Sequence, residues 1–380
     1  MSKKPEPGVQ RDKERGTWLF VVDAPGAEGK RRQVKRRGFR TMDDANDAVR
    51  AFRRKLEDGN VPVPSDDSVA AFAKSWVAAL PAEGVEPATV KHYAECVNRL
   101  LPTIGAVKLQ DLTALDLDRA YAALHELGRA ARTIRASHVA VKKMLTEAVR
   151  VGKVGANIAN DARPPRAKAT KARQFPTWTY EQLHQFLDDT ADHPNAALWH
   201  VAGLTGMREG ELVALRWADV DLDASTVTVC RSVGRGLDGY YDKAPKSAAG
   251  RRTVELDGQL VAVFRRHRQD QLEHRLALGS GWRETGLVFC EVDGSPISAN
   301  RLSKRWSDLT RRRCTALGLP LIRFHDLRHS HATQLLAADV RVDVVTERLG
   351  HSSIAFTLQQ YGHRYAGDQR SGLARLRGAV

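Results

Sequence analysis

Residues 323–330 read Arg-Phe-His-Asp-Leu-Arg-His-Ser and are the most informative stretch of this chain. They place His325 and Arg328 three residues apart near the start of a helix predicted over residues 325–338, so that both side chains share one helix face. Taken alone, such a histidine is more often a packed or surface residue than a functional one. The interpretation therefore depends on which other motifs accompany this helix.

A second segment supplies a tyrosine. Gly350 predicts a left-handed helix stop, which would leave His351 at an exposed corner. Ser352 or Ser353 then caps a short helix that ends near Tyr361. The order is therefore a helix bearing two basic residues, a histidine after a helix stop, and a tyrosine ten residues later.

A third segment lies far upstream. Residues 205–212 contain Arg208 at a turn predicted inside or near a helix, and Glu211 follows one helical turn later. Glu211 can orient Arg208, although an Arg–Glu pair at this spacing also fits a simple surface ion pair. Both interpretations stay open from the sequence.

These residue types suit cleavage of a phosphodiester without a metal. A tyrosine hydroxyl can hold the phosphate covalently, and phenolate is a good leaving group for rejoining. Its ordinary pKa of about 10 requires a basic pocket to help remove the proton. Arginines stay charged and present paired donors to phosphate oxygens, and a lysine can protonate the leaving oxygen. With no acidic cluster and no glycine-rich phosphate loop, we expect neither a metal nor another cofactor.

In this order and spacing, the segments resemble the tyrosine recombinase (phage integrase) family. The matching segments are residues 205–212, the pair at 325 and 328, residues 349–351 and residues 361–363. The segment around Lys246 also looks like the lysine-bearing β-hairpin of that family. The resemblance covers the whole catalytic half and extends more weakly to a helical core-binding unit and an N-terminal arm-binding module.

The resemblance implies the central chemical roles. Tyr361 would be the nucleophile that forms a 3′-phosphotyrosyl link, with Tyr365 as the less favoured candidate. Arg208 and Arg328 would clamp the scissile phosphate. Lys246 would protonate the leaving 5′ hydroxyl. With every role filled, a merely DNA-binding relative is disfavoured.

The histidines divide into two groups under the same resemblance. His325 would assist proton transfer at the tyrosine, and His351 would donate a hydrogen bond to a phosphate oxygen. We expect the others near this region to be helix-surface or packing residues: His329, His331 and His363.

Charge points to the same class of partner. Lysine and arginine number 60 against 45 acidic residues, which gives a net charge of +15 and a pI near 9.9. Such an excess usually indicates a polyanionic partner, most often nucleic acid, although a merely soluble basic protein is the alternative. Four scattered cysteines, a charged N-terminus and no membrane-length apolar run favour a reducing, cytosolic setting. The resemblance to the integrase family implies the cytoplasm of a bacterial cell, in association with the nucleoid.

The expected fold class is α+β with several domains. We expect an arm-type DNA-binding module of small β-sheet plus helix at residues 1–62, and an all-α core-binding domain at 65–160. A basic linker at 161–176 would either lie along a phosphate backbone or act as a solvated tether. The mainly α catalytic domain, with a small antiparallel sheet, would occupy 177–380. Asn157-Ile158-Ala159 departs from the family's usual Asn-Pro before the linker.

Hydrophobic periodicity and caps predict the elements of these parts. Strands are expected at 17–22, 226–231, 240–242 and 251–256, and residues 30–40 are expected to form a second strand or a second and a third. Helices are expected at 41–56, 68–80, 87–101, 115–127 and 132–151, with Pro102 stopping the third. The basic N-terminal strands would present a cationic surface to a DNA groove through Lys30, Arg31, Arg32, Lys35, Arg36 and Arg37.

The implied function is conservative site-specific recombination, which integrates or excises a phage or integrative element. The expected partners are double-stranded attachment-site DNA and further protomers, assembled as a tetramer on DNA, with an excisionase and a host DNA-bending protein as candidate helpers and no membrane. The alternatives are an Xer-like dimer resolvase, a type IB topoisomerase-like enzyme, and a non-catalytic DNA-binding regulator.

Overall fold

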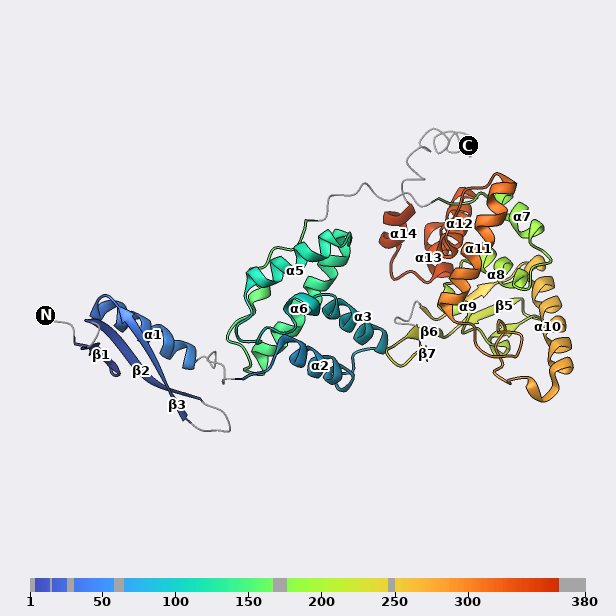
Figure 1. The fold of residues 1–380 in the computed structure, drawn as a ribbon. Coiled ribbons are helices and arrows are strands. Elements are labelled where there is room, and N and C mark those ends of the chain that lie inside the picture. Colours follow the sequence, from blue (N-terminus) through green and yellow to red (C-terminus); the bar gives the residue numbers. More distant parts are fainter. Residues whose placement is uncertain are drawn as a thin grey trace, which may run out of the picture. The chain divides into compact units, whose positions relative to one another are not determined.

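The computed structural model describes residues 4–13, 16–25, 31–57, 65–166, 176–244 and 250–361 (Figure 1). The chain divides into two compact units, Met1–Lys171 and Ala172–Val380. Within the described residues, no helix is both long enough and apolar enough to cross a membrane. Helices dominate and the sheets are small and antiparallel, which confirms the predicted α+β class.

The first unit begins with a small module of one antiparallel sheet and one helix. Its elements are β1 (Val9–Asp12), β2 (Thr17–Pro25), β3 (Arg31–Phe39) and α1 (Met42–Glu57), with the strands in the order β1-β2-β3. The helix buries one face of the sheet through a core that contains Phe20, Val49 and Phe52. Thr41 and Asp44 cap the helix start reciprocally, each side chain accepting from the other's backbone N–H at 3.1 Å.

The sequence left open one or two strands within residues 30–40, and the structure has one, β3, so the second-strand prediction is confirmed. The third strand of the sheet is β1, which lies before β2 and was not predicted. Only Val9 and Asp12 of β1 are buried, so its sequence lacks the apolar alternation that predicts a strand. Pairing with β2, between Val9 and Phe20 at one end, is what makes this segment a strand.

The rest of the first unit is helical. Its helices are α2 (Val69–Ala79), α3 (Pro87–Asn98), α4 (Leu101–Ile104), α5 (Ala114–Glu126) and α6 (Ala131–Arg150). Their apolar faces form one core, as the periodicity predicts, with Trp76, Leu117 and Met144 fully or nearly fully buried. The expectation that Pro102 ends a helix was wrong: α3 already stops at Asn98, and Pro102 lies in the first turn of α4, where its missing N–H costs nothing.

The second unit combines two small β elements with eight helices that the described residues contain. Strands β4 (Val220–Asp221), β5 (Thr226–Val229) and β8 (Arg252–Glu255) form one sheet, and β6 (Ser232–Arg235) pairs with β7 (Tyr240–Lys243). The predicted strands in this region are therefore confirmed. The helices are α7 (Tyr180–Asp189), α8 (Ala196–Thr205), α9 (Glu209–Leu212), α10 (Gly258–Leu278), α11 (Ala299–Leu317), α12 (Phe324–Ala337), α13 (Val342–Leu349) and α14 (Ile354–Tyr361).

Aromatic packing fixes the helix that carries the His-x-x-Arg motif. Trp199 on α8 and Trp306 on α11 lie edge to face at 5.2 Å between ring centroids, and Phe324 at the start of α12 packs on both. The backbone N–H of Trp178 donates to the Ser330 hydroxyl at 2.9 Å. Because α12 is held from two sides, its polar residues have defined positions.

A second, smaller cluster joins α12, α13 and α14. It consists of Ala332, Leu336, Val345, Leu349 and Tyr361. The ring of Tyr361 thus packs in this apolar cluster, while its hydroxyl group makes polar contacts.

Candidate active site

Two glycine turns form the base of the site. Gly206 ends α8 and Gly350 ends α13, both with φ +64°, so the helix stop predicted at Gly350 is confirmed. A Cβ at Gly206 would lie 2.8 Å from atoms of both His331 and Leu349. Glycine is therefore required at Gly206 by its backbone conformation and by the close approach of α12 and α13.

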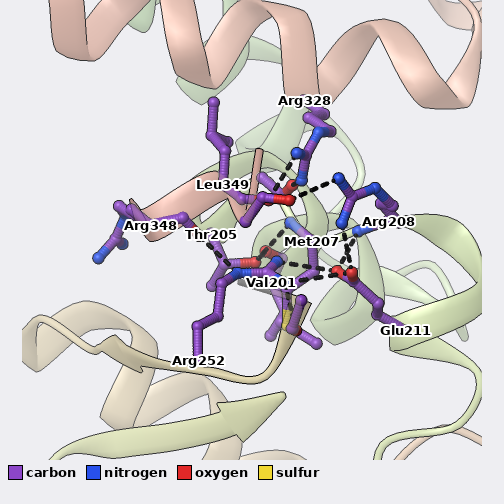
Figure 2. A network of polar contacts seen from close by, with 12 residues as sticks. Val201, Thr205, Met207, Arg208, Glu211, Arg252, Arg328, Arg348 and Leu349 are labelled. Atoms are coloured by element: carbon purple, nitrogen blue, oxygen red, sulfur yellow. Dashed lines mark hydrogen bonds and ion pairs between the residues drawn. The ribbon is translucent and has the colours of Figure 1, made fainter. Parts of the chain in front are cut away.

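Each of the two candidate clamp arginines bonds the end of helix α13, as Figure 2 shows. Arg208, which immediately precedes α9, donates from Nη2 to the Gly350 carbonyl at 2.9 Å. Arg328 on α12 donates to the carbonyls of Gly206 and Leu349 at 2.7 and 2.6 Å. The structure therefore brings Arg208 and Arg328 together although they lie 120 residues apart in sequence. Two neighbouring guanidinium groups can bind one anion together.

The two arginines differ in exposure. The side chain of Arg208 is 39% exposed, whereas Arg328 is 3% exposed. Burial first, and then the positive charge of Arg208, lower the pKa of Arg328 to about 9. A buried cation beside a second cation is electrostatically unsatisfied, and a bound anion would relieve it.

Glu211 is a buried hub and not half of a surface ion pair, so the simpler interpretation of the Arg–Glu spacing was wrong. Its side chain is 6% exposed and accepts from Arg208 Nη1 at 2.8 Å and from the Arg208 backbone N–H at 2.8 Å. It also accepts from Arg252 Nη1 and Nη2 at 3.1 and 2.8 Å. Burial acts to raise the pKa of Glu211, but the Arg252 hydrogen bond and the two arginine charges outweigh it and lower the pKa.

Arg252 was missed as a site residue. It occupies an inward position of β8, where burial alternates, and its Nε donates to the Arg348 carbonyl at 2.7 Å (Figure 2). The available signal was that alternation: a strand that buries Val254 also turns the residue two before it inward. A basic side chain at an inward strand position requires a buried acidic partner, here Glu211.

His351 does not lie at an exposed corner, as the sequence suggested, but is buried at 7% exposure. Its Nδ1 lies 2.8 Å from the Thr357 hydroxyl, and its ring lies parallel to that of Tyr361 at 6.3 Å. Burial, followed by the charges of Arg328 and Arg208, lowers its pKa to about 3. The Ser353 hydroxyl accepts from Phe356 N–H, which confirms the predicted cap before α14.

The Tyr361 hydroxyl contacts a histidine, but not the one expected. It lies 2.7 Å from Nδ1 of His329, which is buried at 7% and was predicted to be a surface or packing residue. His325 is exposed and meets His329 edge to face at 5.1 Å between ring centroids. Although the residue as a whole is exposed, neighbouring atoms partly desolvate its ring. This desolvation, and then the positive charge of Arg328, lower the pKa of His325.

Burial sets the ionisation of this pair. It raises the pKa of Tyr361 to about 12 even though the charges of Arg328 and Arg208 act in the opposite direction. Burial, and then the nearby His325, lower the pKa of His329 to about 4. Both groups are therefore neutral near pH 7 and share one hydrogen bond.

Some candidates fall outside the described residues: Lys246, Tyr365, His363 and Lys30. The hairpin β6–β7 precedes the Lys246 segment, and β8 follows it. Gly210 of α9 lies against this hairpin, since a Cβ there would be 2.7 Å from the Ser232 hydroxyl. His331 is a buried packing residue whose Nε2 accepts from Arg348 Nε at 3.1 Å.

The basic residues of β3 divide between the two faces of the N-terminal sheet. Arg36 pairs with Phe20, lies over the Phe52 ring at 5.6 Å, and so belongs to the face that α1 covers. The strand register places Arg32 on that face too. The opposite face carries the remaining described candidates: Arg31, Lys35 and Arg37.

Comparison with known proteins identifies two family models that match this chain. A model described as the phage integrase family matches residues 175–367, and one described as an arm DNA-binding domain matches residues 9–56. An integrase of Streptomyces ambofaciens is 29% identical over 93% of this chain and 91% of its own length. A XerC-like tyrosine recombinase of Caldanaerobacter subterraneus is 28% identical over 72% of each chain.

The fold is also similar to solved structures. The Tn1549 transposon integrase in complex with a circular intermediate DNA has a TM-score of 0.65 and 19% identity, over 82% of this chain and 99% of that one. A lambda integrase dimer bound to a COC′ core site has a TM-score of 0.54 and 16% identity, over 95% and 96%.

The family match identifies the class of protein: an enzyme that cleaves and rejoins DNA. Because the family model spans half of the sequence, the chain belongs to the phage integrase family of tyrosine recombinases. The family and the enzyme class predicted from the motifs are thereby confirmed.

Proposed function

We propose that this chain recombines attachment-site DNA to integrate or excise a phage or integrative element, with Tyr361 as the nucleophile. The observation that carries the proposal is the Tyr361 hydroxyl, which lies 2.7 Å from His329 Nδ1 and experiences the positive charges of Arg328 and Arg208. An attacking phenol needs a fixed direction and nearby cations for the phosphate, and this arrangement supplies both.

The clamp depends on the N–H groups that the two arginines keep for an anion. A guanidinium has five N–H groups, and within the described part of the chain Arg208 and Arg328 each donate through two nitrogens to the partners given above. Phosphate oxygens can therefore bind without displacing the carbonyls that orient the guanidinium groups. In the same proposal, Lys246 protonates the leaving 5′ oxygen and His351 contacts a phosphate oxygen.

His329 takes over part of the role expected of His325. It contacts the Tyr361 hydroxyl directly, so we assign it as the positioning residue of the nucleophile. His325, exposed beside His329, remains available to exchange a proton with it or with solvent. This division gives a separate role to each of the two histidines beside Arg328: His325, three residues before it, and His329, one residue after it.

The domain roles complete the proposal. Residues 1–62 bind arm DNA, 65–160 and 177–380 bind the core site, and the basic linker 161–176 follows the phosphate backbone. A match to an arm DNA-binding model and a neighbouring structure of a lambda integrase tetramer on a Holliday junction support assembly on DNA. The protein would act in the bacterial cytoplasm beside the nucleoid, with an excisionase and a host DNA-bending protein setting direction.

The test is a nicked suicide substrate, which traps the covalent adduct. Tyr361→Phe removes one oxygen and no charge, so binding should persist while the adduct disappears. Tyr240→Phe, at an exposed tyrosine of β7, is the matched control and should form the adduct at the normal rate. A normal adduct yield from Tyr361→Phe would move the nucleophile elsewhere, with Tyr365 the next candidate.

The arm role has its own test on the full chain. Replacing Arg31 and Lys35 with glutamine removes two charges from the face opposite α1, whereas Arg50 and Arg54 on α1 serve as the matched pair. The first variant should lose arm binding and most integrative recombination but still cleave core DNA. Equal recombination by both variants would contradict the arm assignment.

A further inference from the structure

His351 is held through one ring nitrogen by a chain of buried hydroxyl groups. Its Nδ1 lies 2.8 Å from Thr357 Oγ1, which lies 2.8 Å from Thr346 Oγ1, which in turn lies 2.6 Å from the Val342 carbonyl oxygen. Thr357 is fully buried, and Thr346 is 8% exposed. This series of hydrogen bonds therefore runs from His351 through Thr357 of α14 to the backbone of α13.

The directions of these hydrogen bonds follow from the atoms at the far end. A carbonyl oxygen has no hydrogen, so Thr346 must donate to Val342. A hydroxyl has a single hydrogen, so Thr346 can only accept from Thr357. Thr357 has then used its hydrogen as well and must accept from the ring. His351 consequently carries a proton on Nδ1.

This assignment changes what the other ring nitrogen can do. A neutral imidazole has one N–H, so with Nδ1 protonated the Nε2 atom is a bare acceptor. Phosphate oxygens are acceptors too. The hydrogen bond to phosphate expected of His351 is therefore unavailable to the neutral ring and requires the imidazolium.

We propose that Thr346 and Thr357 are positioning residues that keep the proton of neutral His351 on Nδ1, so that His351 contacts the scissile phosphate only after taking up a second proton. The proposal rests on the proposed function, because that function places the phosphate at this cluster. Binding of the phosphate and protonation of His351 then become one linked step.

The surroundings make the uptake conditional on DNA. His351 faces Arg208, Arg252 on β8, Arg328 and His329 on α12, and the Tyr361 ring on α14. Burial and these cations keep the ring neutral in the free protein, with a pKa of about 3. A phosphate charge about 3 Å away, at an effective dielectric of about 20, raises the pKa by about 4 units. In the complex, the ring would therefore titrate near neutral pH.

The first measurement needs no DNA and no activity. In the full chain with ¹⁵N-labelled histidine, the nitrogen shifts of His351, assigned by comparison with His351→Gln, should show the neutral tautomer protonated at Nδ1. Thr346→Val frees the Thr357 hydrogen to point at the ring, so the tautomer should shift towards Nε2–H. Thr310→Val is the matched control, since this buried threonine of α11 likewise donates to a carbonyl four residues earlier. An Nε2–H tautomer in the unmodified protein would overturn the proposal.

The second measurement follows the proton. Calorimetry of core-site binding by Tyr361→Phe protein, in two buffers of different ionisation enthalpy, should show an uptake at pH 7 that exceeds the uptake after His351→Gln by about half a proton. The excess should approach one proton at pH 6. Equal uptake with and without His351 would refute the linkage even if the adduct assay upholds Tyr361 as nucleophile.

The third measurement is the pH profile of single-turnover cleavage. The unmodified protein should lose rate as pH rises above about 7, because neutral His351 cannot donate. Thr346→Val should flatten this loss, since the Nε2–H tautomer donates without extra protonation, and Thr346→Ser should restore it. A uniform slowing of Thr346→Val at every pH would indicate a purely structural role and would contradict the proposal.

Discussion

Removing the guanidinium of Arg252 should destabilise the catalytic unit by about 3–5 kcal/mol, the usual cost of stranding one partner of a buried ion pair. The side chains of Arg252 and Glu211 are only 3% and 6% exposed, and they share two hydrogen bonds of 2.8 and 3.1 Å. Arg252→Ala leaves the Glu211 carboxylate buried with the half-exposed Arg208 still bonded to it. For a domain of about 200 residues, the loss corresponds to a fall of about 6–20 °C in melting temperature.

The assay is thermal unfolding of the full chain, followed by circular dichroism. Arg266→Ala is the matched control, because Arg266 and Asp270 form a pair at 2.9 Å on α10 with side chains 79% and 44% exposed. Such a surface pair contributes about 0–1 kcal/mol. Arg252→Lys should fall between the two, because an ammonium cannot bond Glu211 twice and the Arg348 carbonyl as well. If Arg252→Ala and Arg266→Ala lower the melting temperature equally, the reasoning about the buried pair is refuted.

Three further outcomes follow from the site. His329→Leu should slow cleavage by about 10- to 100-fold with DNA binding intact, because an unmade buried hydrogen bond costs about 1–3 kcal/mol. His329→Asn keeps an acceptor near the position of Nδ1, so it should cleave faster than His329→Leu in the same single-turnover assay. The pKa values of His329, His331 and His351 are lowered to about 4, 3 and 3 from an ordinary 6.5. The free energy of unfolding should therefore be highest above pH 6.5. Below that pH each histidine should lower it by about 1.4 kcal/mol per pH unit until its own folded-state pKa is reached, and His331→Leu should reduce that slope in denaturant titrations. Inorganic phosphate should raise the melting temperature more than chloride at equal ionic strength, and this difference should shrink in Arg208→Gln.

Most helices could be predicted because their signals are local. Ser353 accepts a hydrogen bond from the N–H group of Phe356, three residues on, as the sequence predicts for the cap of the helix that ends at Tyr361. Segments without a local signal were missed. Strand β1 depends on pairing with β2, and α4 begins beside Pro102, a residue that indicates a helix end and a helix start equally well.

The candidate site divides along the same line. Motif spacing was sufficient to propose Arg208, Arg328 and Tyr361 as candidates, because their residue types and order are themselves the signal. It could not show that His351 is buried or that His329 contacts the tyrosine, because both depend on how α12 and α14 pack. Burial and hydrogen-bond partners are properties of contacts between distant segments, and a single sequence does not display them.

The charge arrangement indicates why the cluster is built on backbone carbonyls. Arg208 and Arg252 share the carboxylate of Glu211, whereas Arg328 donates to two carbonyls that carry no net charge. If a second carboxylate neutralised Arg328, a phosphate would have to displace it and would gain little. Carbonyls instead fix the direction of the guanidinium and leave its charge available, which is the arrangement that stabilises an anion without reorganisation. The pKa of Arg328 is lowered to about 9, because burial and the charge of Arg208 make its own positive charge unfavourable in the free protein. A phosphate bound beside Arg328 would relieve this repulsion. In the proposed function, the repulsion that destabilises the free site would therefore strengthen the binding of the scissile phosphate.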